Sequence, residues 1–315
     1  MASRMNKLKR SHSLSPPLAE YSEDKPSLVQ PESPQKAKKQ KLQSEFAAES
    51  PFPAFPQPTP DTAKEVFQLL SKEHPGKGRR QDPPEESNPS VETGDKVPNV
   101  ISSLIGTILS QNTSNINSSR AKASLDKAFG KNNFSVIVNA PHADVVEAIR
   151  SGGLANKKAK TIQNVLRSIK ARHGDYSLQH LASSEDGKRM TDDDIMQELV
   201  SYDGVGPKTA SCVLLFCLER DSFAVDTHIF RLSKLLGWVP QKADRILTQA
   251  HLDHRIPNDL KYGLHVLMIT HGRACKGCKQ TGARAPCILK TYLKERKSEN
   301  DTEIEAKVES MEAEE

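Results

Sequence analysis

The sequence predicts an all-α fold arranged as two helical layers or lobes. Apolar residues recur at helical spacing from residue 98 to about 292, as in Val100, Leu104 and Ile108. No segment of this region alternates apolar and polar residues convincingly, as a half-buried strand would. Start and stop signals divide the region into short helices, which are expected to pack around apolar cores.

Each helix is predicted from its own local pattern. Residues 61–73 carry an apolar stripe, and either Asp61 or Thr62 can cap this helix. Gly130 is a stop signal for one helix, and Thr191 with the acids after it forms a capped first turn for another. Further helices are predicted near 100–109 and at 116–129, 143–150, 156–173, 191–201 and 258–271.

The chain divides into one folded domain and two tails. Residues 1–60 are rich in Pro, Ser, Lys and Glu without a sustained apolar period, which predicts a disordered basic tail. Residues 297–315 are predicted to form a disordered acidic tail. The folded domain is predicted at 61–296, with one lobe at about 98–220 and a second lobe formed by 61–76 and 221–296.

The net charge of +5 conceals an uneven distribution. Residues 298–315 carry eight acidic side chains and one lysine, so their net charge is −7 and the rest of the chain carries +12. A basic body with an acidic tail is typical of a protein that binds a polyanion. No apolar run approaches the roughly 18 residues that span a bilayer, so we expect a soluble protein with no membrane partner.

The N-terminal tail carries two basic clusters, Lys7–Arg10 and Lys36–Lys41. Their spacing predicts import into the nucleus, and the tail is a candidate site for import or repair partners. The first 19 residues contain Arg, Lys and Ser but no acid, so a mitochondrial presequence stays open as an alternative.

The most informative motif is Tyr-Asp-Gly-Val-Gly-Pro-Lys-Thr-Ala at residues 202–210. Glycine permits backbone dihedrals that other residues resist, and amides at a helix N-terminus bind phosphate oxygens. A helix–hairpin–helix contact with a DNA backbone is therefore predicted through Gly204, Val205, Gly206 and Thr209. An ordinary helix connection with glycine in its turn is the alternative.

Lys208 and Asp226 are the candidate catalytic residues. Lys208 follows the first-turn proline of the second helix, and Asp226 comes 18 residues later in Val-Asp-Thr-His. The positive end of a helix disfavours an ammonium group, and a neutral lysine is a nucleophile that can form a Schiff base. Asp226 can also cap the helix that follows it. Both roles can coexist because a carboxylate has two oxygens.

These motifs together resemble the endonuclease III family of helix–hairpin–helix DNA glycosylases. The resemblance covers about 98–292 and rests on the motifs around Lys208 and Asp226, on Ile108–Thr113, on Gly152–Ala159 and on Leu267–Arg273. It implies a two-lobed helical fold with a catalytic cleft between the lobes. It also implies that the partner is damaged double-stranded DNA, bound by a monomer.

The resemblance implies specific roles for the two candidate residues. Lys208 would attack the sugar C1′ and displace the damaged base, and Asp226 would help to deprotonate Lys208. Because superfamily members that only remove bases lack the lysine, Lys208 implies a bifunctional glycosylase and AP lyase of base-excision repair, acting on oxidised pyrimidines. A glycosylase for mismatched or modified bases and a noncatalytic DNA-binding or scaffold protein are the alternatives.

The resemblance also assigns residues that face the DNA. A damaged base must leave the stack before its sugar can be attacked. Gln111 or Asn112 would fill the vacated space, and Leu154 would wedge against the opposite base unless it only packs in the core. Lys157 and Lys158 would contact the DNA.

The cysteines depart from the family pattern. Cys212 and Cys217 are predicted to lie in the core, and the chain lacks the apolar signal segment that would favour disulfides. The family often holds a [4Fe–4S] cluster on four cysteines. Only three cysteines follow His271-Gly272-Arg273, namely Cys275, Cys278 and Cys287, and Leu293 stands where a fourth ligand is expected. We therefore expect no conventional [4Fe–4S] cluster, and a zinc site completed by a histidine stays open.

Overall fold

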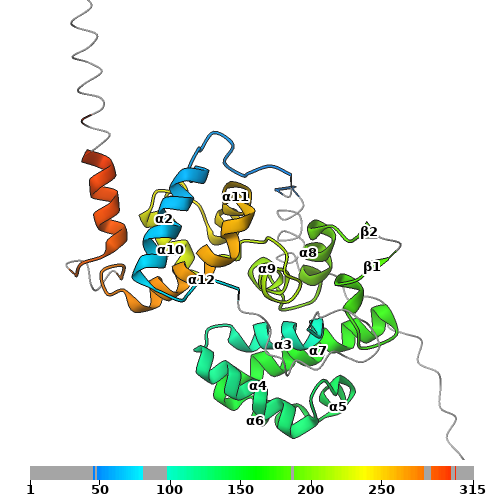
Figure 1. The fold of residues 1–315 in the computed structure, drawn as a ribbon. Helices are drawn as coiled ribbons and strands as arrows, with labels where there is room; N and C mark the ends of the chain where they lie inside the picture. The colour runs from blue at the N-terminus through cyan, green and yellow to red at the C-terminus, as the bar shows by residue number, and fades with distance from the viewer. Residues whose placement is uncertain are drawn as a thin grey trace, which may run out of the picture. The chain divides into compact units, whose positions relative to one another are not determined.

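The computed structural model describes residues 45–46, 48–80, 98–185, 188–279, 285–298 and 302, and these confirm the all-α prediction. Figure 1 shows the helices in chain order. The α-helices are α2 (Pro60–Glu73), α3 (Val100–Ser110), α4 (Asn115–Phe129), α5 (Phe134–Asn139), α6 (His142–Ala148), α7 (Ala155–His173), α8 (Asp192–Ser201), α9 (Pro207–Phe216), α10 (Thr227–Leu235), α11 (Arg245–Arg255) and α12 (Asn258–Ala274).

Shorter elements complete this list. Two 3-10 turns, η1 (Arg150–Gly152) and η2 (Gln179–Leu181), flank α7, and residues 288–298 are helical. The strands β1 (Ser184–Glu185) and β2 (Lys188–Arg189) pair antiparallel, with Ser184 opposite Arg189. The sequence did not predict this pair, because two residues are too few to show alternation.

Two of the predicted helix-end signals are confirmed and one is not. Thr191 caps α8 by accepting a hydrogen bond from the Asp194 amide, and α4 ends at Gly130, whose φ is 87°. The cap predicted for the first helix was wrong. Thr59, and not Asp61 or Thr62, accepts a hydrogen bond from the Thr62 amide, because the helix already begins at Pro60.

The helices bury two separate apolar clusters. The first cluster is formed by α3 to α9 and has fully buried members such as Leu104 and Leu166. The second cluster joins α2 to α10, α11 and α12 around Trp238. Figure 1 shows the two groups of helices, with α2 lying next to α12 although some 200 residues separate them in sequence. No helix in the described ranges has the length and apolarity to cross a bilayer.

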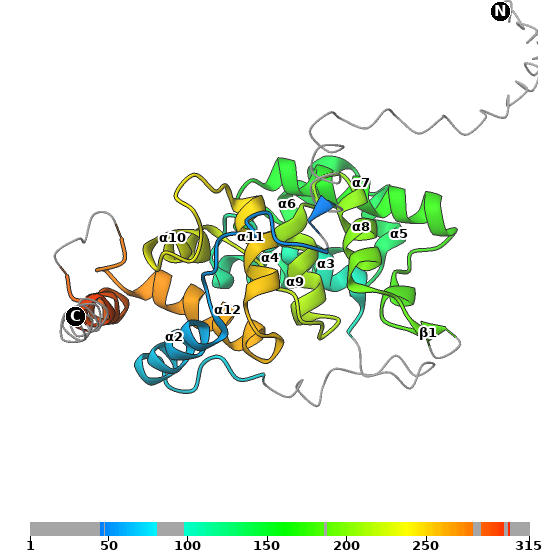
Figure 2. The same ribbon diagram turned by 90° about the horizontal axis from the view of Figure 1, so that it is seen from above.

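The chain passes from the first cluster to the second between Leu218 and Phe223. At this crossing the Ser211 and Ser222 hydroxyls lie 2.6 Å apart, and Phe216 of α9 contacts His265 of α12 with ring centroids 5.3 Å apart. Figure 2 shows the same proximity of α9 and α12 from above. Helix α9, which carries Lys208 in its first turn, is thereby held against the second cluster. Most of the two predicted tails lies outside the described residues, and the predicted domain boundaries stay a prediction.

Candidate active site

The turn between α8 and α9 is a tight hairpin. The Val205 amide donates to the Tyr202 carbonyl over 3.1 Å, and Gly204 has a φ of 86°. A Cβ at Gly204 would lie 2.6 Å from Cγ2 of Thr161 on α7, so both conformation and space require glycine there. The hairpin is therefore pressed against the first turns of α7.

Gly206, unlike Gly204, does not use the conformational freedom that glycine permits. Its φ is −110°, which other residues adopt readily, and a Cβ there would meet no atom within 4 Å. Gly206 caps the N-terminus of α9, where the first helical amides lack partners within the helix. The open space beside it leaves this backbone accessible to a large partner.

The other predicted hairpin contacts point inward. Val205 is 6% exposed and belongs to the first apolar cluster. Thr209 is 4% exposed, and its hydroxyl accepts a hydrogen bond from the Gln111 side-chain amide over 3.1 Å. Only the backbone of these two residues is therefore left to contact a partner, and Gln111 ties the end of α3 to α9.

Lys208 and Asp226 occupy the starts of consecutive helices. Lys208 is the second residue of α9 and is half-buried. Asp226 caps α10, and its Oδ1 accepts hydrogen bonds from the amides of His228 and Ile229, each over 2.8 Å. The cap uses only one oxygen, so Oδ2 has no part in it.

A buried histidine that the sequence analysis missed lies near both residues. His265 is 2% exposed, and its Nδ1 donates to the Ala224 carbonyl over 2.8 Å. Burial first, and then the charge of Lys208, lower the pKa of His265 to about 4, although the charge of Asp226 acts to raise it. His265 is therefore neutral at physiological pH, and both charges act on it. Its only signal in the sequence is a polar residue within an apolar helix.

The side chain of Lys208 also interacts with Cys212. Burial raises the pKa of the Cys212 thiol, and a hydrogen bond and charge from the Lys208 side chain act in the opposite direction. Cys212 lies one helical turn after Lys208, so the lysine side chain folds back along α9. The predicted core position of Cys212 agrees with its 5% exposure.

Two loops near this site hold non-glycine residues in left-handed conformations. Asn112 has a φ of 50° and Leu154 a φ of 51°, and both side chains are exposed. Such conformations cost free energy and persist only where the surrounding structure enforces them. Leu154 is 56% exposed, which does not agree with the alternative that it packs in the core. Lys157 is exposed on the next turn of α7.

Lys158, by contrast, lies inside the protein. It is 2% exposed, and burial lowers its pKa. Its ammonium group donates to three acceptors, namely the Leu109 carbonyl at 2.7 Å, the Thr113 hydroxyl at 2.6 Å and the Gly152 carbonyl at 2.7 Å. Lys158 therefore connects the loop that follows α3 to the loop that precedes α7. The prediction that Lys158 contacts DNA does not agree with this buried position of its ammonium group.

We predict that Lys158→Met disturbs these loops. Methionine fills a similar volume but removes three buried hydrogen bonds. The Gly152 carbonyl keeps its hydrogen bond from the Thr113 hydroxyl, so the main cost falls on the Leu109 carbonyl, at about 1–3 kcal/mol for a buried group without a partner. Thermal unfolding and DNA affinity measure the effect, with Lys170→Met on the exposed end of the same helix as control. Equal stability and affinity in the two variants would show that the buried ammonium does not position the loops.

Four candidate metal ligands converge at the end of α12. They are His271, Cys275, Cys278 and Cys287, whose ligand atoms all lie within 4.8 Å of one another. Cys278 Sγ lies 3.1 Å from Cys287 Sγ and 3.2 Å from His271 Nε2. The other ring nitrogen of His271 lies 3.0 Å from Nε2 of His74, which takes the place of the outer hydrogen-bond partner that orients a ligating histidine.

This cluster overturns the expectation that the chain holds no conventional [4Fe–4S] cluster, because His271 joins the three cysteines as a fourth candidate ligand. That expectation counted cysteines only. His271 lies one helical turn before Cys275, and its ring reaches the place where the three sulfur atoms meet. Three thiolates with one imidazole form a donor set suited to an iron–sulfur centre or a zinc ion. Gly277 fits this arrangement, because a Cβ there would lie 2.9 Å from the Cys287 Cβ and 2.5 Å from the Ala285 carbonyl oxygen.

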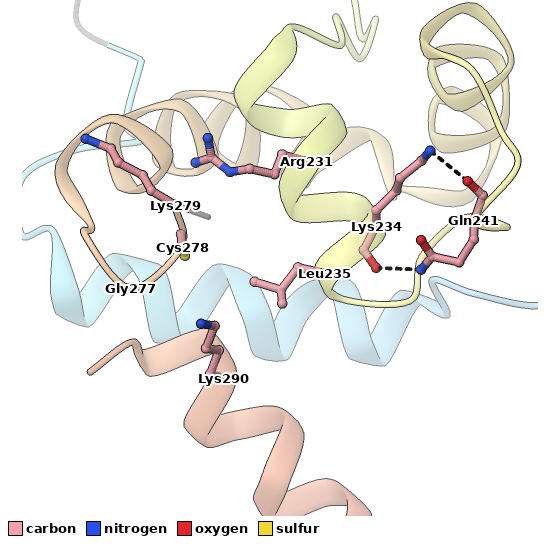
Figure 3. Close-up of a pocket in the computed structure, with 8 residues that line it drawn as sticks. All are labelled: Arg231, Lys234, Leu235, Gln241, Gly277, Cys278, Lys279 and Lys290. Carbon is pink, nitrogen blue, oxygen red and sulfur yellow. Dashed lines mark hydrogen bonds between the residues drawn. The ribbon is translucent and has the colours of Figure 1, made fainter. Parts of the chain in front are cut away.

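The surface beside this cluster is basic. A pocket of about 310 Å³ is bordered by Cys278 and Gly277, and Figure 3 shows the residues that line it. Its lining contains Arg231, Lys234, Lys279 and Lys290 and no acidic residue. The guanidinium of Arg231 donates to the Gly272 carbonyl over 2.9 Å, which links α10 to the end of α12. Such a surface suits contact with a polyanion.

The chain is similar in sequence to known DNA repair proteins. Residues 105–258 match the family described as HhH-GPD superfamily base excision DNA repair protein. A protein of Arabidopsis thaliana, named as a candidate DNA glycosylase, is 43% identical over 185 residues, which cover 59% of this chain and 60% of that protein. Endonuclease III of Sulfolobus acidocaldarius is 32% identical over 203 residues, covering 63% of this chain and 83% of that enzyme.

Solved structures show the same fold. A non-covalent endonuclease III–DNA complex is 22% identical, with a TM-score of 0.54 over 73% of this chain and 93% of that one. A trapped covalent endonuclease III–DNA intermediate is 20% identical, with a TM-score of 0.52 over 72% of this chain and 98% of that one.

Proposed function

The chain belongs to the HhH-GPD superfamily of base-excision repair DNA glycosylases and is endonuclease III-like, and from this premise we propose that it is a bifunctional glycosylase and AP lyase for oxidised pyrimidines. The observation that carries the proposal is that Lys208 and Asp226 occupy the starts of the consecutive helices α9 and α10, and that the charges of both act on the buried His265. Lysine is the residue type that forms a Schiff base with a sugar aldehyde carbon.

The proposed reaction uses Lys208 as the nucleophile. Its neutral amine forms a bond to C1′ of the damaged nucleotide, the bond from C1′ to the base breaks, and the base leaves with that electron pair. Asp226 accepts the proton from the lysine nitrogen and stabilises the cationic sugar. The C1′–O4′ bond of this adduct then breaks, O4′ takes up the proton held by Asp226, and the nitrogen lone pair forms the Schiff base to C1′. Loss of a proton from C2′ breaks the C3′–O bond, the 3′ phosphate leaves with that electron pair, and the strand is nicked.

The two strained loops are suited to hold the DNA open. Leu154 exposes an apolar side chain on a rigid loop, and an apolar wedge stabilises unstacked DNA. Asn112 presents a polar side chain from the neighbouring loop, which Lys158 joins to the first. We assign Leu154 to the opposite strand and Asn112 to the space left by the flipped base. Gln111 serves mainly as the link to Thr209.

The hairpin supplies the proposed backbone contact. The amides at the start of α9 and the open space beside Gly206 suit a DNA phosphate, and Lys157 adds an exposed charge nearby. These contacts do not distinguish one base from another. Selectivity for oxidised pyrimidines therefore belongs to the pocket that receives the flipped base.

We predict that Asp226→Asn lowers the rate of base removal by about 10²–10⁴-fold, the range expected for loss of a general base. Asparagine keeps an oxygen that can cap α10, so the variant is expected to fold. Single-turnover cleavage of a damaged-base duplex measures the rate. Asp244→Asn is the matched control because Asp244 caps α11 in the same way. The proposed role fails if both variants cleave at the wild-type rate.

A panel of duplexes tests the proposed function. Wild-type protein is expected to form a covalent adduct with abasic DNA in borohydride, which reduces the Schiff base to a stable amine. It is also expected to release oxidised pyrimidines faster than mismatched or alkylated bases. Base release without any adduct would instead identify a monofunctional glycosylase. Binding with neither activity would identify a noncatalytic DNA-binding protein.

A further inference from the structure

A second group of metal-ligating side chains lies where α7 ends beside α8. His173 is the last residue of α7, His180 lies in η2, and Glu198 lies in α8. His173 Nε2 is 3.1 Å from Glu198 Oε1, and His180 Nε2 is 3.0 Å from Glu198 Oε2. The three ligand atoms lie within 4.8 Å of one another. The proposed reaction at Lys208 uses none of these side chains.

The spacing of these atoms is close to that around a tetrahedral ion. Zinc binds imidazole nitrogen at about 2.0–2.1 Å and carboxylate oxygen at about 2.0–2.2 Å, which places neighbouring ligand atoms about 3.4 Å apart. The two observed N···O distances are slightly shorter than this, so small side-chain rotations would admit an ion. The imidazole rings lie side by side, with centroids 4.8 Å apart.

We propose that His173, His180 and Glu198 bind one divalent transition-metal ion of the zinc class. Two histidines and one carboxylate are a known zinc-binding set that leaves a position for water. The three side chains are 24%, 32% and 15% exposed, so water and the ion have access. On binding, the proton that each imidazole shares with the carboxylate moves from Nε2 to Nδ1, and each Nε2 lone pair faces the ion.

The neighbouring groups are compatible with this site. The Tyr202 hydroxyl donates to Glu198 Oε1 over 3.0 Å, which orients the carboxylate as an outer partner would. The guanidinium of Arg172, a like charge on α7, stacks 4.8 Å over the Tyr202 ring and donates to the Ser201 hydroxyl. Arg172 is therefore engaged with the end of α8.

An ion bound at His173, His180 and Glu198 would affect the neighbouring hairpin. Glu198 and Tyr202 lie directly before the hairpin at 203–206, and the hairpin packs on Thr161 of α7. An ion shared by α7, η2 and α8 would hold the first helix of the hairpin to α7. Zinc would thus stiffen the hairpin without touching Lys208 or Asp226.

Zinc retention by the full chain tests the proposal. Equilibrium dialysis against zinc followed by elemental analysis compares wild type, His180→Asn and the surface control His254→Asn. Wild type and His254→Asn are expected to retain one more equivalent of zinc per chain than His180→Asn does. Repeating the comparison in a Cys278→Ser background separates this site from the cysteine cluster. Equal retention by all three proteins overturns the proposal and leaves two ordinary hydrogen bonds.

Thermal unfolding provides a second measurement. Added zinc is expected to raise the melting temperature of wild type and His254→Asn by more than that of His180→Asn, because an ion that binds only the native state stabilises it. Circular dichroism verifies that His180→Asn is folded before zinc is added. An identical rise in all three folded proteins also counts against the site.

Discussion

Replacing Lys208 with glutamine is expected to abolish borohydride trapping on abasic DNA and to reduce strand nicking by at least about a thousandfold. Glutamine is polar and of similar length, so it can still contact Cys212, but it has no amine to attack C1′. The remaining hairpin and loops are untouched, so the affinity for DNA is expected to change little. Trapping, nicking and binding are measured on the same abasic duplex.

The matched control for this prediction is Lys242→Gln. Lys242 is exposed between α10 and α11, and its loss removes the same charge from another part of the protein. Trapping by Lys208→Gln at the level of this control would exclude Lys208 as the nucleophile. The adduct would then have to form on another amine, which peptide mapping of the trapped complex would identify.

Replacing Cys278 with serine is expected to remove a bound metal centre and to lower the free energy of unfolding by at least about 3 kcal/mol. Cys278 is 6% exposed, and its sulfur faces both Cys287 and His271. A metal bound here would join the end of α12 to the helix at 288–298. In a domain of this size the loss corresponds to a fall in melting temperature of about 6–12 °C.

Anaerobic purification with analysis of iron, sulfide and zinc checks this prediction. Iron with matching sulfide would identify an iron–sulfur centre, and zinc without sulfide would identify a single-ion site. Cys217→Ser is the control, because Cys217 is buried in the first apolar cluster and is expected to leave the metal content unchanged. Wild-type protein without any of these elements, and with the same melting temperature as Cys278→Ser, would exclude a metal centre.

The two expected results rest on different kinds of information. Lys208 and Asp226 could be selected from the sequence because each belongs to a short motif whose helix start is encoded locally. His271 could not be selected as a ligand by counting cysteines, because its role depends on where α12 ends and where the chain returns with Cys287. The Thr191 cap was predicted correctly for the same local reason, since its hydrogen bond spans three residues.

The sequence by itself therefore determined the helical fold class, the family and the candidate pair Lys208 and Asp226. The tertiary structure decided which side chains are buried and what they touch. Lys158, expected to meet DNA, instead joins two loops from within, and His265 proved to lie near both catalytic candidates. The physical reason is that a helix start or a turn depends on neighbouring residues, whereas burial and ligand geometry depend on segments that meet only after the helices pack.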